Sequence, residues 1–371
     1  MILTGRLLWA ESADAEPAWT EGAWRIEAGR IDRVEERSGD LAGFAIPGFA
    51  DSHAHIGIGA RGPCGPEGQE AQARAQARTG VLAIRDCGSP VDTRWIDARA
   101  DLPRIARAGR HLARPKRYIR GLPVDLEDVS RLPEEVAAQA ARSDGWVKIV
   151  GDWIDRSKGA DSDLEPLWPR EVLVDAVAAA HESGARVAVH SFARSTIDDL
   201  LEAGVDDIEH ATGMDADQAD EAARRGVLVT PTLLQVELFS EFAAQAGSKY
   251  PVYAATMTRM HETRHERFAM LRDLGVRLVM GTDSGGYQEH GTIGAEFALW
   301  EAAGVPRAEL VDVASWRSRR DLGFEPLHPG ASADLLVYSA DPLDASVPLA
   351  EPDAVVLRGG VISSRSPRPR A

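Results

Sequence analysis

The stretch Gly184-Ala-Arg-Val-Ala-Val-His190 contains a glycine, a short apolar run and a histidine, and it follows an alanine-rich segment of helical character. The glycine suits the left-handed conformation that ends a helix, and the apolar run suits a strand buried on both faces of a parallel sheet. The same order of features recurs at four other places, which are 80–86, 204–210, 226–232 and 275–283. This repetition predicts a series of strand and helix units.

Three further segments have the character of strands: 49–55, 104–111 and 145–150. Together with the five repeated units they make eight, the number of parallel strands that closes a (β/α)8 or TIM barrel. We therefore predict an α/β protein with a TIM barrel over residues 47–326, and an open doubly wound sheet is the alternative. Because functional groups gather at the carboxyl ends of parallel strands, we expect His190, His210 and Asp283 at one mouth.

The two ends of the chain have a different pattern. Residues 1–46 and 330–363 alternate apolar and polar side chains, which is typical of small antiparallel sheets. We predict that 1–46 and 327–371 pair into one small, β-sandwich-like domain, with the barrel inserted between them. The last residues, Ser363 to Ala371, are rich in Pro and Arg and are expected to form a disordered tail.

Composition limits the partners that we expect. The net charge of −16 argues against nucleic acids and anionic membranes, because both attract basic surfaces. Cys64 and Cys87 are the only cysteines, so any metal would use nitrogen and oxygen ligands, and the chain fits a reducing, cytoplasmic environment. No apolar run is long enough to cross a membrane. We expect a small-molecule substrate, and the chain could form a homo-oligomer.

The histidines of Ile46-Pro-Gly-Phe-Ala-Asp-Ser-His-Ala-His-Ile56 are separated by one residue. Alternation along a strand directs both imidazoles, His53 and His55, to the same face. An isolated pair of this kind is more often a surface strand, but this pair accompanies three other polar strand ends. Imidazole and carboxylate groups suit Zn²⁺ and similar cations, so the pair is interpreted as half of a metal site.

Three segments together resemble the metal-dependent hydrolases of the amidohydrolase superfamily: 47–55, Gly281-Thr-Asp-Ser284 and 329–338. Within that superfamily the chain is most similar to the branch of Xaa-Pro dipeptidases and imidazolonepropionase-like enzymes. The resemblance implies that His53, His55 and Asp283 bind one divalent metal. It also implies that His190 and His210 bind a second, giving two Zn²⁺ per chain.

Lys148 lies inside a predicted apolar strand, in a chain that has only four lysines against thirty-eight arginines. Burial lowers the pKa of a lysine, and the neutral amine can capture CO2. The resemblance implies a carbamate on Lys148 that bridges the two metals. The alternatives are a lysine whose amine reaches solvent and one that pairs with Asp152.

With this ligand set, we expect a metal-bridging hydroxide to attack the carbon of an amide or peptide-like C–N bond, with Asp283 as general base and acid. An imidazolonepropionase-like cyclic amide hydrolase with a mononuclear site is one alternative. A barrel-based binding protein without catalysis is another.

Several polar and aromatic residues follow predicted strand ends, where they could contact a substrate. Arg120 could grip a carboxylate in a bidentate manner, and His290 could donate a hydrogen bond. The set predicted to bind substrate comprises Tyr118, Arg120, Trp153, Tyr287 and His290.

Overall fold

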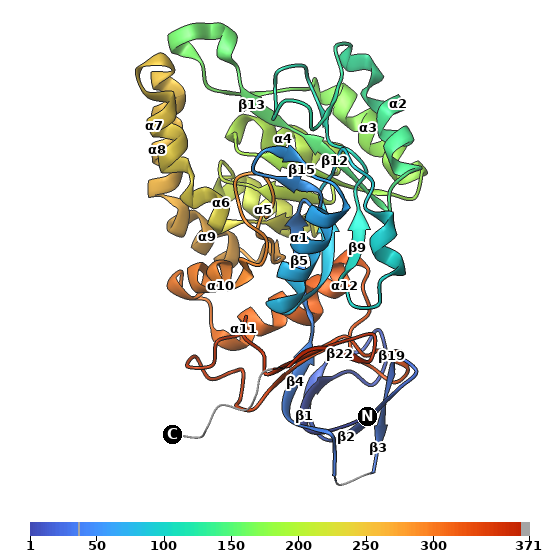
Figure 1. Cartoon of the computed structure of the whole chain (residues 1–371). Coiled ribbons are helices and arrows are strands. Elements are labelled where there is room, and N and C mark those ends of the chain that lie inside the picture. The colour runs from blue at the N-terminus through green and yellow to red at the C-terminus, as the bar shows by residue number, and fades with distance from the viewer. Residues whose placement is uncertain (36–37, 365–371) are drawn as a thin grey trace.

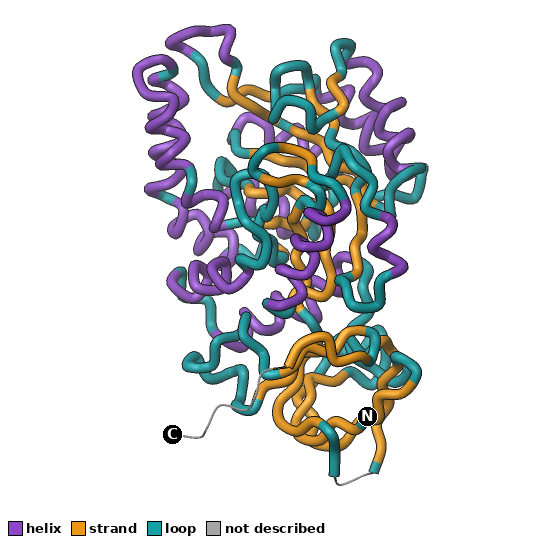
Figure 2. The backbone as a smooth tube through the Cα atoms, viewed as in Figure 1, coloured by secondary structure: helices purple, strands orange, loops and turns teal. Residues whose placement is uncertain are grey.

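The computed structural model describes residues 1–35 and 38–364 of the chain. Strands form the centre of the larger part of the molecule, and helices lie around them (Figure 2). The parallel strands belong to two sheets. One contains β5 (Phe49–Ala54), β8 (Val81–Asp86) and β9 (Arg104–Arg107). The other contains β11 (Val124–Asp125), β10 (Leu112–Ala113), β12 (Trp146–Val150), β15 (Arg186–Ser191), β16 (Asp207–His210), β17 (Leu228–Thr230) and β18 (Arg277–Leu278).

All eight predicted strands are present, as β5, β8, β9, β12, β15, β16, β17 and β18. Their helical connections also follow the prediction. Gly204 (φ 77°) ends the helix before β16 and Gly226 (φ 70°) the helix before β17, both in the left-handed conformation that a glycine adopts without strain. The repeated glycine is therefore confirmed as the end of a helix.

Helices of very different length connect the strands. The longer ones are α1 (Pro66–Arg78), α2 (Leu132–Ala140), α3 (Arg170–Glu182), α4 (Arg194–Ala203), α5 (Ala216–Arg225), α7 (Phe239–Ala246), α8 (Pro251–Glu262), α9 (Arg264–Asp273) and α10 (Ile293–Ala302). The shorter ones are η1 (Arg94–Ala98), η2 (Val129–Arg131), η3 (Arg156–Asp161), α6 (Leu233–Glu237), η4 (Gly247–Lys249), α11 (Arg307–Asp312), η5 (Val313–Arg317) and α12 (Ser318–Leu322).

Backbone hydrogen bonds join the first strand of one parallel sheet to residues that follow the last strand of the other. The N–H of Ser52 donates to the carbonyl of Met280, and the N–H of Asp283 donates to the carbonyl of His53, each at 2.7 Å. Ala54 also forms a parallel bridge with Ser284. The result is a mixed α/β protein with a curled sheet in which the carboxyl end of β5 lies beside Asp283.

Strands from both ends of the chain form one eight-stranded sheet (Figure 1), in which the pair 2–9 and 41–47 is parallel and not antiparallel as expected. Its core includes Leu7, Trp24 and Leu335, which are buried. The strands follow the order β19 (Ala331–Ser332), β3 (Arg30–Val34), β2 (Ala18–Glu27), β1 (Ile2–Trp9), β4 (Leu41–Pro47), β20 (Leu335–Tyr338), β21 (Ala354–Leu357) and β22 (Gly360–Ser364). The division of the chain into two domains stays a prediction.

Two antiparallel hairpins lie after β5 and β12. They pair β6 (Ile58–Gly59) with β7 (Gly62–Pro63), and β13 (Asp152–Ile154) with β14 (Leu164–Pro166). Both hairpins begin within a few residues of a predicted metal ligand. They therefore contribute to the walls around the strand ends.

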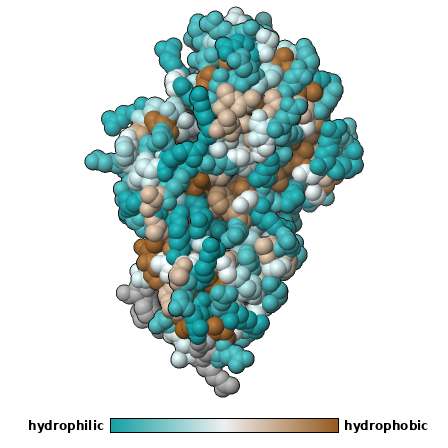
Figure 3. All heavy atoms as spheres, turned by 90° about the vertical axis from the view of Figure 1, so that its right-hand side faces the viewer, coloured by the Kyte–Doolittle hydropathy of each residue, from teal (hydrophilic) through white to brown (hydrophobic). Residues whose placement is uncertain are grey.

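The prediction of a disordered tail from Ser363 onward was wrong for its first two residues, because Ser363 and Ser364 end β22 and pair with β21. The remainder of that prediction, residues 365–371, lies outside the described residues. Within the described ranges, no helix is both long and apolar enough to span a bilayer. Hydrophilic side chains predominate on the face shown in Figure 3, and apolar ones form scattered patches.

Candidate metal centre and substrate pocket

The structure places five of the six predicted metal ligands at the carboxyl side of the parallel strands, and the sixth, Lys148, in the middle of its strand. His53 lies in β5, Lys148 in β12 and His190 in β15, while His210 ends β16. His55 follows β5 and Asp283 follows β18. All of these side chains are buried except that of Asp283, which is 15% exposed.

Two of these residues have left-handed backbones, which non-glycine residues rarely adopt. The φ angle is 66° at His210 and 56° at Asp283. Such conformations persist only where the surrounding structure imposes them, and they are concentrated at functional sites. The turn at each strand end therefore directs its side chain to the mouth of the sheet.

The first group of ligand atoms forms a small triangle. Nε2 of His53 lies 3.3 Å from Nε2 of His55, and Oδ1 of Asp283 lies 3.1 Å and 3.3 Å from these two nitrogens. Nδ1 of His55 donates to the carbonyl of Gly88 at 3.0 Å, so its Nε2 carries the lone pair in the neutral ring. Burial lowers the pKa of His53 to about 4, which keeps this ring neutral. Three electron-pair donors thus converge, as a cation requires.

The second group consists of His190 and His210. Nδ1 of His190 lies 3.0 Å from Nε2 of His210, and burial holds the pKa of both rings well below the usual value. Nδ1 of His210 lies 2.7 Å from the hydroxyl of Thr232, which fixes the orientation of the ring. Nε2 of His190 is buried without a hydrogen-bond partner. The two groups adjoin, because ligand atoms of His53, His210 and Asp283 lie within 4.8 Å of one another.

Lys148 is completely buried, and burial lowers the pKa of its amine to about 8. Its Nζ contacts the carboxylate of Glu209. Asp152 is not its partner: this carboxylate accepts hydrogen bonds from the hydroxyl of Ser191 and the backbone N–H groups of Phe192 and Ala193. Asp152 therefore supports the end of the strand that carries His190.

Glu209 is the main residue of the centre that sequence reasoning missed. One of its oxygens lies 3.6 Å from Nδ1 of His53 and accepts hydrogen bonds from the thiol of Cys87 at 3.0 Å and from Arg85 at 3.3 Å. Arg85 also pairs with Asp207. His53, Cys87 and Glu209 lie close enough together to hold a metal. Burial, however, raises the pKa of the Cys87 thiol, so the thiol keeps its proton and donates it in a hydrogen bond to Glu209. The sequence did contain a signal for this network, because Glu209 and Arg85 are charged residues inside apolar strands, where charged side chains are rare unless they are paired.

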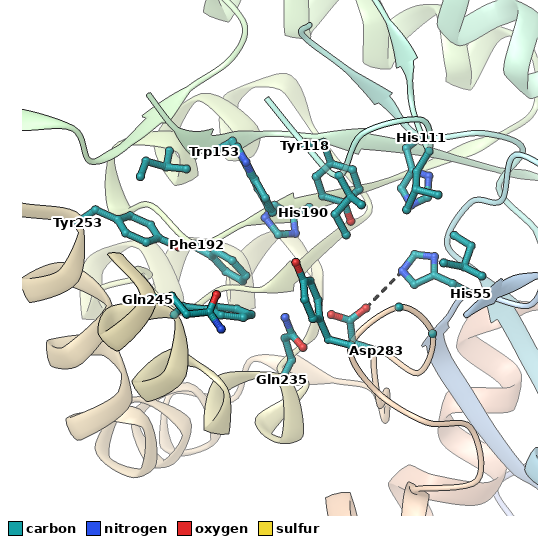
Figure 4. Close-up of a pocket in the computed structure, with 18 of the residues that line it drawn as sticks. His55, His111, Tyr118, Trp153, His190, Phe192, Gln235, Gln245, Tyr253 and Asp283 are labelled. Carbon is teal, nitrogen blue, oxygen red and sulfur yellow. Dashed lines mark ion pairs between the residues drawn. The ribbon is translucent and has the colours of Figure 1, made fainter. Parts of the chain in front are cut away.

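A pocket of about 260 Å³ opens next to the ligand groups (Figure 4). Of the predicted substrate-binding residues, Tyr118, Trp153 and Tyr287 line this pocket. Arg120 is exposed and lies outside the lining, as does His290. The lining also contains residues that the sequence analysis missed, chiefly His111, Arg156, Phe192 and Gln235.

His111 is the one missed lining residue with a clear sequence signal, because it ends a predicted strand segment. Its ring stacks on that of His55, with centroids 5.1 Å apart. Burial holds its pKa well below the usual value, and neither ring nitrogen has a hydrogen-bond partner. His111 is thus a neutral, unpartnered polar group on the pocket wall.

Comparisons with known proteins agree with this arrangement. The profile of the amidohydrolase family matches residues 44–362. The uncharacterized protein Rv2915c of Mycobacterium tuberculosis is 47% identical over 339 residues, which cover 91% of this chain and 90% of the relative.

Solved structures are similar over nearly the whole length. A Xaa-Pro dipeptidase with bound methionine has a TM-score of 0.79 and 22% identity, covering 97% of this chain and 98% of that one. The ochratoxinase of A. niger has a TM-score of 0.78 and 18% identity, covering 98% and 95%. At these identities the likeness concerns the fold.

Proposed function

The chain belongs to the amidohydrolase family, and we propose that it cleaves an amide or peptide-like C–N bond of a small molecule. Family membership makes it a hydrolase acting on carbon–nitrogen bonds. The observation that carries the proposal is the convergence of lone pairs at the strand ends. Two neighbouring groups, one around His53 and one around His210, bring ring nitrogens of neighbouring histidines to within 3.3 Å and 3.0 Å of each other beside a pocket.

The donor set fits divalent cations. His53, His55 and Asp283 would hold one, and His190 and His210 would hold the other, with Zn²⁺ favoured by the imidazole-rich set. Such ions, when bound, lower the pKa of water from 15.7 towards about 7 and polarise a substrate carbonyl. The unpartnered Nε2 of His190 and the tautomer fixed at His55 support this assignment.

Lys148 is proposed to carry a carbamate. Its amine is buried, and the pKa of about 8 leaves a share of it neutral and nucleophilic at neutral pH. Attack of this nitrogen on CO2 forms an N–C bond and releases one proton. The product is an anionic oxygen ligand beside both histidine groups, which would link the two ions.

Asp283 is proposed as the general base and acid. Its Oδ1 lies 3.1 Å from Nε2 of His53 and 3.3 Å from Nε2 of His55, and a cation held between these atoms would favour the charged form of the carboxyl. The ionised carboxylate borders the pocket, so it can take a proton from the attacking water and pass it to the leaving nitrogen. Tyr118 and Trp153, on the same pocket wall, would orient the substrate.

We extend the proposal to the architecture. A closed (β/α)8 barrel over 47–326 is supported by an apolar layer to which separate strands each contribute one residue, among them Ala50, Ala83, Trp146 and Ala188. The backbone hydrogen bonds between β5 and the segment after β18 support closure. Residues 1–46 and 327–371 would form the second domain.

The test is metal content and turnover on full-length protein expressed with zinc and bicarbonate. We expect about two metals per chain, falling to one or fewer in Lys148→Ala and unchanged in Lys158→Ala, whose exposed amine pairs with Glu165. Hydrolysis of Xaa-Pro dipeptides and N-acyl amides would be assayed in parallel. One metal, unaffected by Lys148→Ala, would contradict the bridged centre and favour a mononuclear site.

A further inference from the structure

The aromatic residues of this chain are unevenly distributed. Only 6% of the residues are aromatic, and there are five tyrosines. Four of these line the pocket beside the metal-ligand groups, namely Tyr118, Tyr250, Tyr253 and Tyr287. The pocket is thus enriched in side chains that offer flat apolar faces together with a polar tip.

The rings form a continuous wall that begins at the ligand groups. Tyr118 lies 4.9 Å from Trp153 between ring centroids, and Phe192 lies 4.3 Å from His190. Figure 4 shows Tyr253 and Phe192 at one end of the pocket and His55 at the other, with His190 and Asp283 between them. A substrate whose scissile bond lies near Asp283 would therefore place its remaining part against the aromatic end.

Tyr287 is unusual because its ring is 67% exposed, the highest value among the exposed large apolar side chains of the described residues. It follows Gly285 and Gly286, whose φ angles are 117° and 66°. The centroid of the ring lies 5.6 Å from that of Phe242, and both residues line the pocket. An exposed ring at the edge of an apolar pocket loses water-accessible area when a ligand fills that pocket, and this favours binding.

Charge on the lining is sparse. Apart from the histidines, Asp283 and Arg156 are the charged residues among the described side chains that form it. The glutamines Gln235 and Gln245 supply neutral polar groups. Such a wall offers a charged substituent few partners of opposite charge, whereas an aromatic ring would find several rings at stacking distance.

Building on the proposed amide hydrolysis, we infer that the substrate carries an aromatic ring next to the scissile bond, bound against Trp153 and Phe192 and covered by Tyr287. The class of substrate is then an aryl or arylalkyl amide, rather than an amide with small aliphatic substituents. Tyr287 and Trp153 are specificity-determining residues in this inference.

Calorimetric titration of the zinc-loaded, full-length protein with 4-phenylbutan-2-one and butan-2-one tests this. Both ligands have a carbonyl and no C–N bond, so they bind without being hydrolysed. We expect the phenyl ligand to bind about 10- to 100-fold more tightly, as burial of one ring predicts. Tyr287→Ala and Trp153→Ala should each reduce the ratio of the two Kd values at least about fivefold.

The control is Val361→Ala, which removes an exposed apolar side chain from the terminal sheet and should leave the ratio unchanged. A ratio below about threefold in the unmodified protein overturns the inference. A large ratio that neither pocket variant changes overturns it too. The proposed function is tested separately. If the protein hydrolyses amides but binds the two ketones with equal Kd, only the aromatic site is refuted. If it binds the phenyl ketone more tightly but hydrolyses no amide, only the hydrolase is refuted.

Discussion

The hydroxyl of Thr232 lies 2.7 Å from Nδ1 of His210, and both residues have left-handed backbones, with φ angles of 44° and 66°. The contact links the end of β17 to the end of β16. It leaves Nε2 of His210 facing His190. Thr232 thus acts on the candidate centre through the ring that it orients.

Thr232→Val should weaken metal binding while the fold is retained, because valine has nearly the same shape but no hydroxyl. Loss of such an outer hydrogen bond typically reduces metal affinity about 10- to 100-fold. Competition with a chromophoric chelator would measure the Kd. Thr212→Val is the matched control, since the Thr212 hydroxyl bonds to the carbonyl of Phe192 instead of a histidine. Equal affinities in both variants would rule out the role of Thr232.

Glu209→Gln should strongly destabilise the protein, because it leaves the buried Arg85 without part of its compensating charge. Breaking a buried ion pair costs about 3 to 5 kcal/mol in the free energy of unfolding. Glu202→Gln, which disrupts an exposed pair with Arg170, should cost less than about 1 kcal/mol. Urea unfolding monitored by circular dichroism compares them. If Glu209→Gln lowered the free energy of unfolding no more than Glu202→Gln does, the buried network would not be important for stability.

Glu296 gives the pH-dependent prediction. Its carboxylate accepts hydrogen bonds from the backbone N–H groups of Leu233 and Leu234 and from the indole of Trp300. Burial nevertheless raises its pKa from 4.5 to about 7. The folded state therefore holds a proton that the unfolded state has lost between these pH values. The contribution of Glu296 to stability falls as pH rises through this window.

Glu296→Gln should remove this dependence. Between pH 5 and pH 8 the free energy of unfolding of the unmodified protein should fall on the order of 2 to 3 kcal/mol more than that of the variant. Glu301→Gln, on the exposed side of the same helix, should behave like the unmodified protein. Denaturant titrations at several pH values provide the measurement. Parallel pH profiles for the unmodified protein and Glu296→Gln would contradict the raised pKa.

Arg156 supplies a prediction about carboxylate recognition. It lines the pocket and makes no hydrogen bond or ion pair with any described residue, whereas Arg120 lies outside the lining. For dipeptides that carry an aromatic side chain, such as Phe-Pro, Arg156→Gln should raise KM about tenfold relative to the C-terminal amides of the same dipeptides. Arg120→Gln should change this ratio less than about twofold. The opposite pattern would restore Arg120 as the carboxylate-binding residue.

Local patterns in the sequence were sufficient to locate the strands and most of the candidate ligands. Glycine-ended helices and buried apolar runs are local features, because the left-handed backbone and the burial of both strand faces depend on neighbouring residues. Three of the five runs ended in His190, His210 and Asp283, so the order of residues alone predicted these side chains at one mouth. The alternating ends of the chain likewise predicted the terminal sheet.

Packing between distant segments determines which charged groups meet inside the curled sheet and which side chains line the pocket. Glu209 precedes a predicted ligand, but its contacts reach two other strands: Lys148 lies in β12, Arg85 lies in β8, and Cys87 directly follows β8. Arg120 and Arg156 both follow strands, and loop geometry alone places Arg156 on the lining and Arg120 outside it. Burial and distance between residues far apart in the chain arise from the tertiary structure, and no local sequence pattern specifies them.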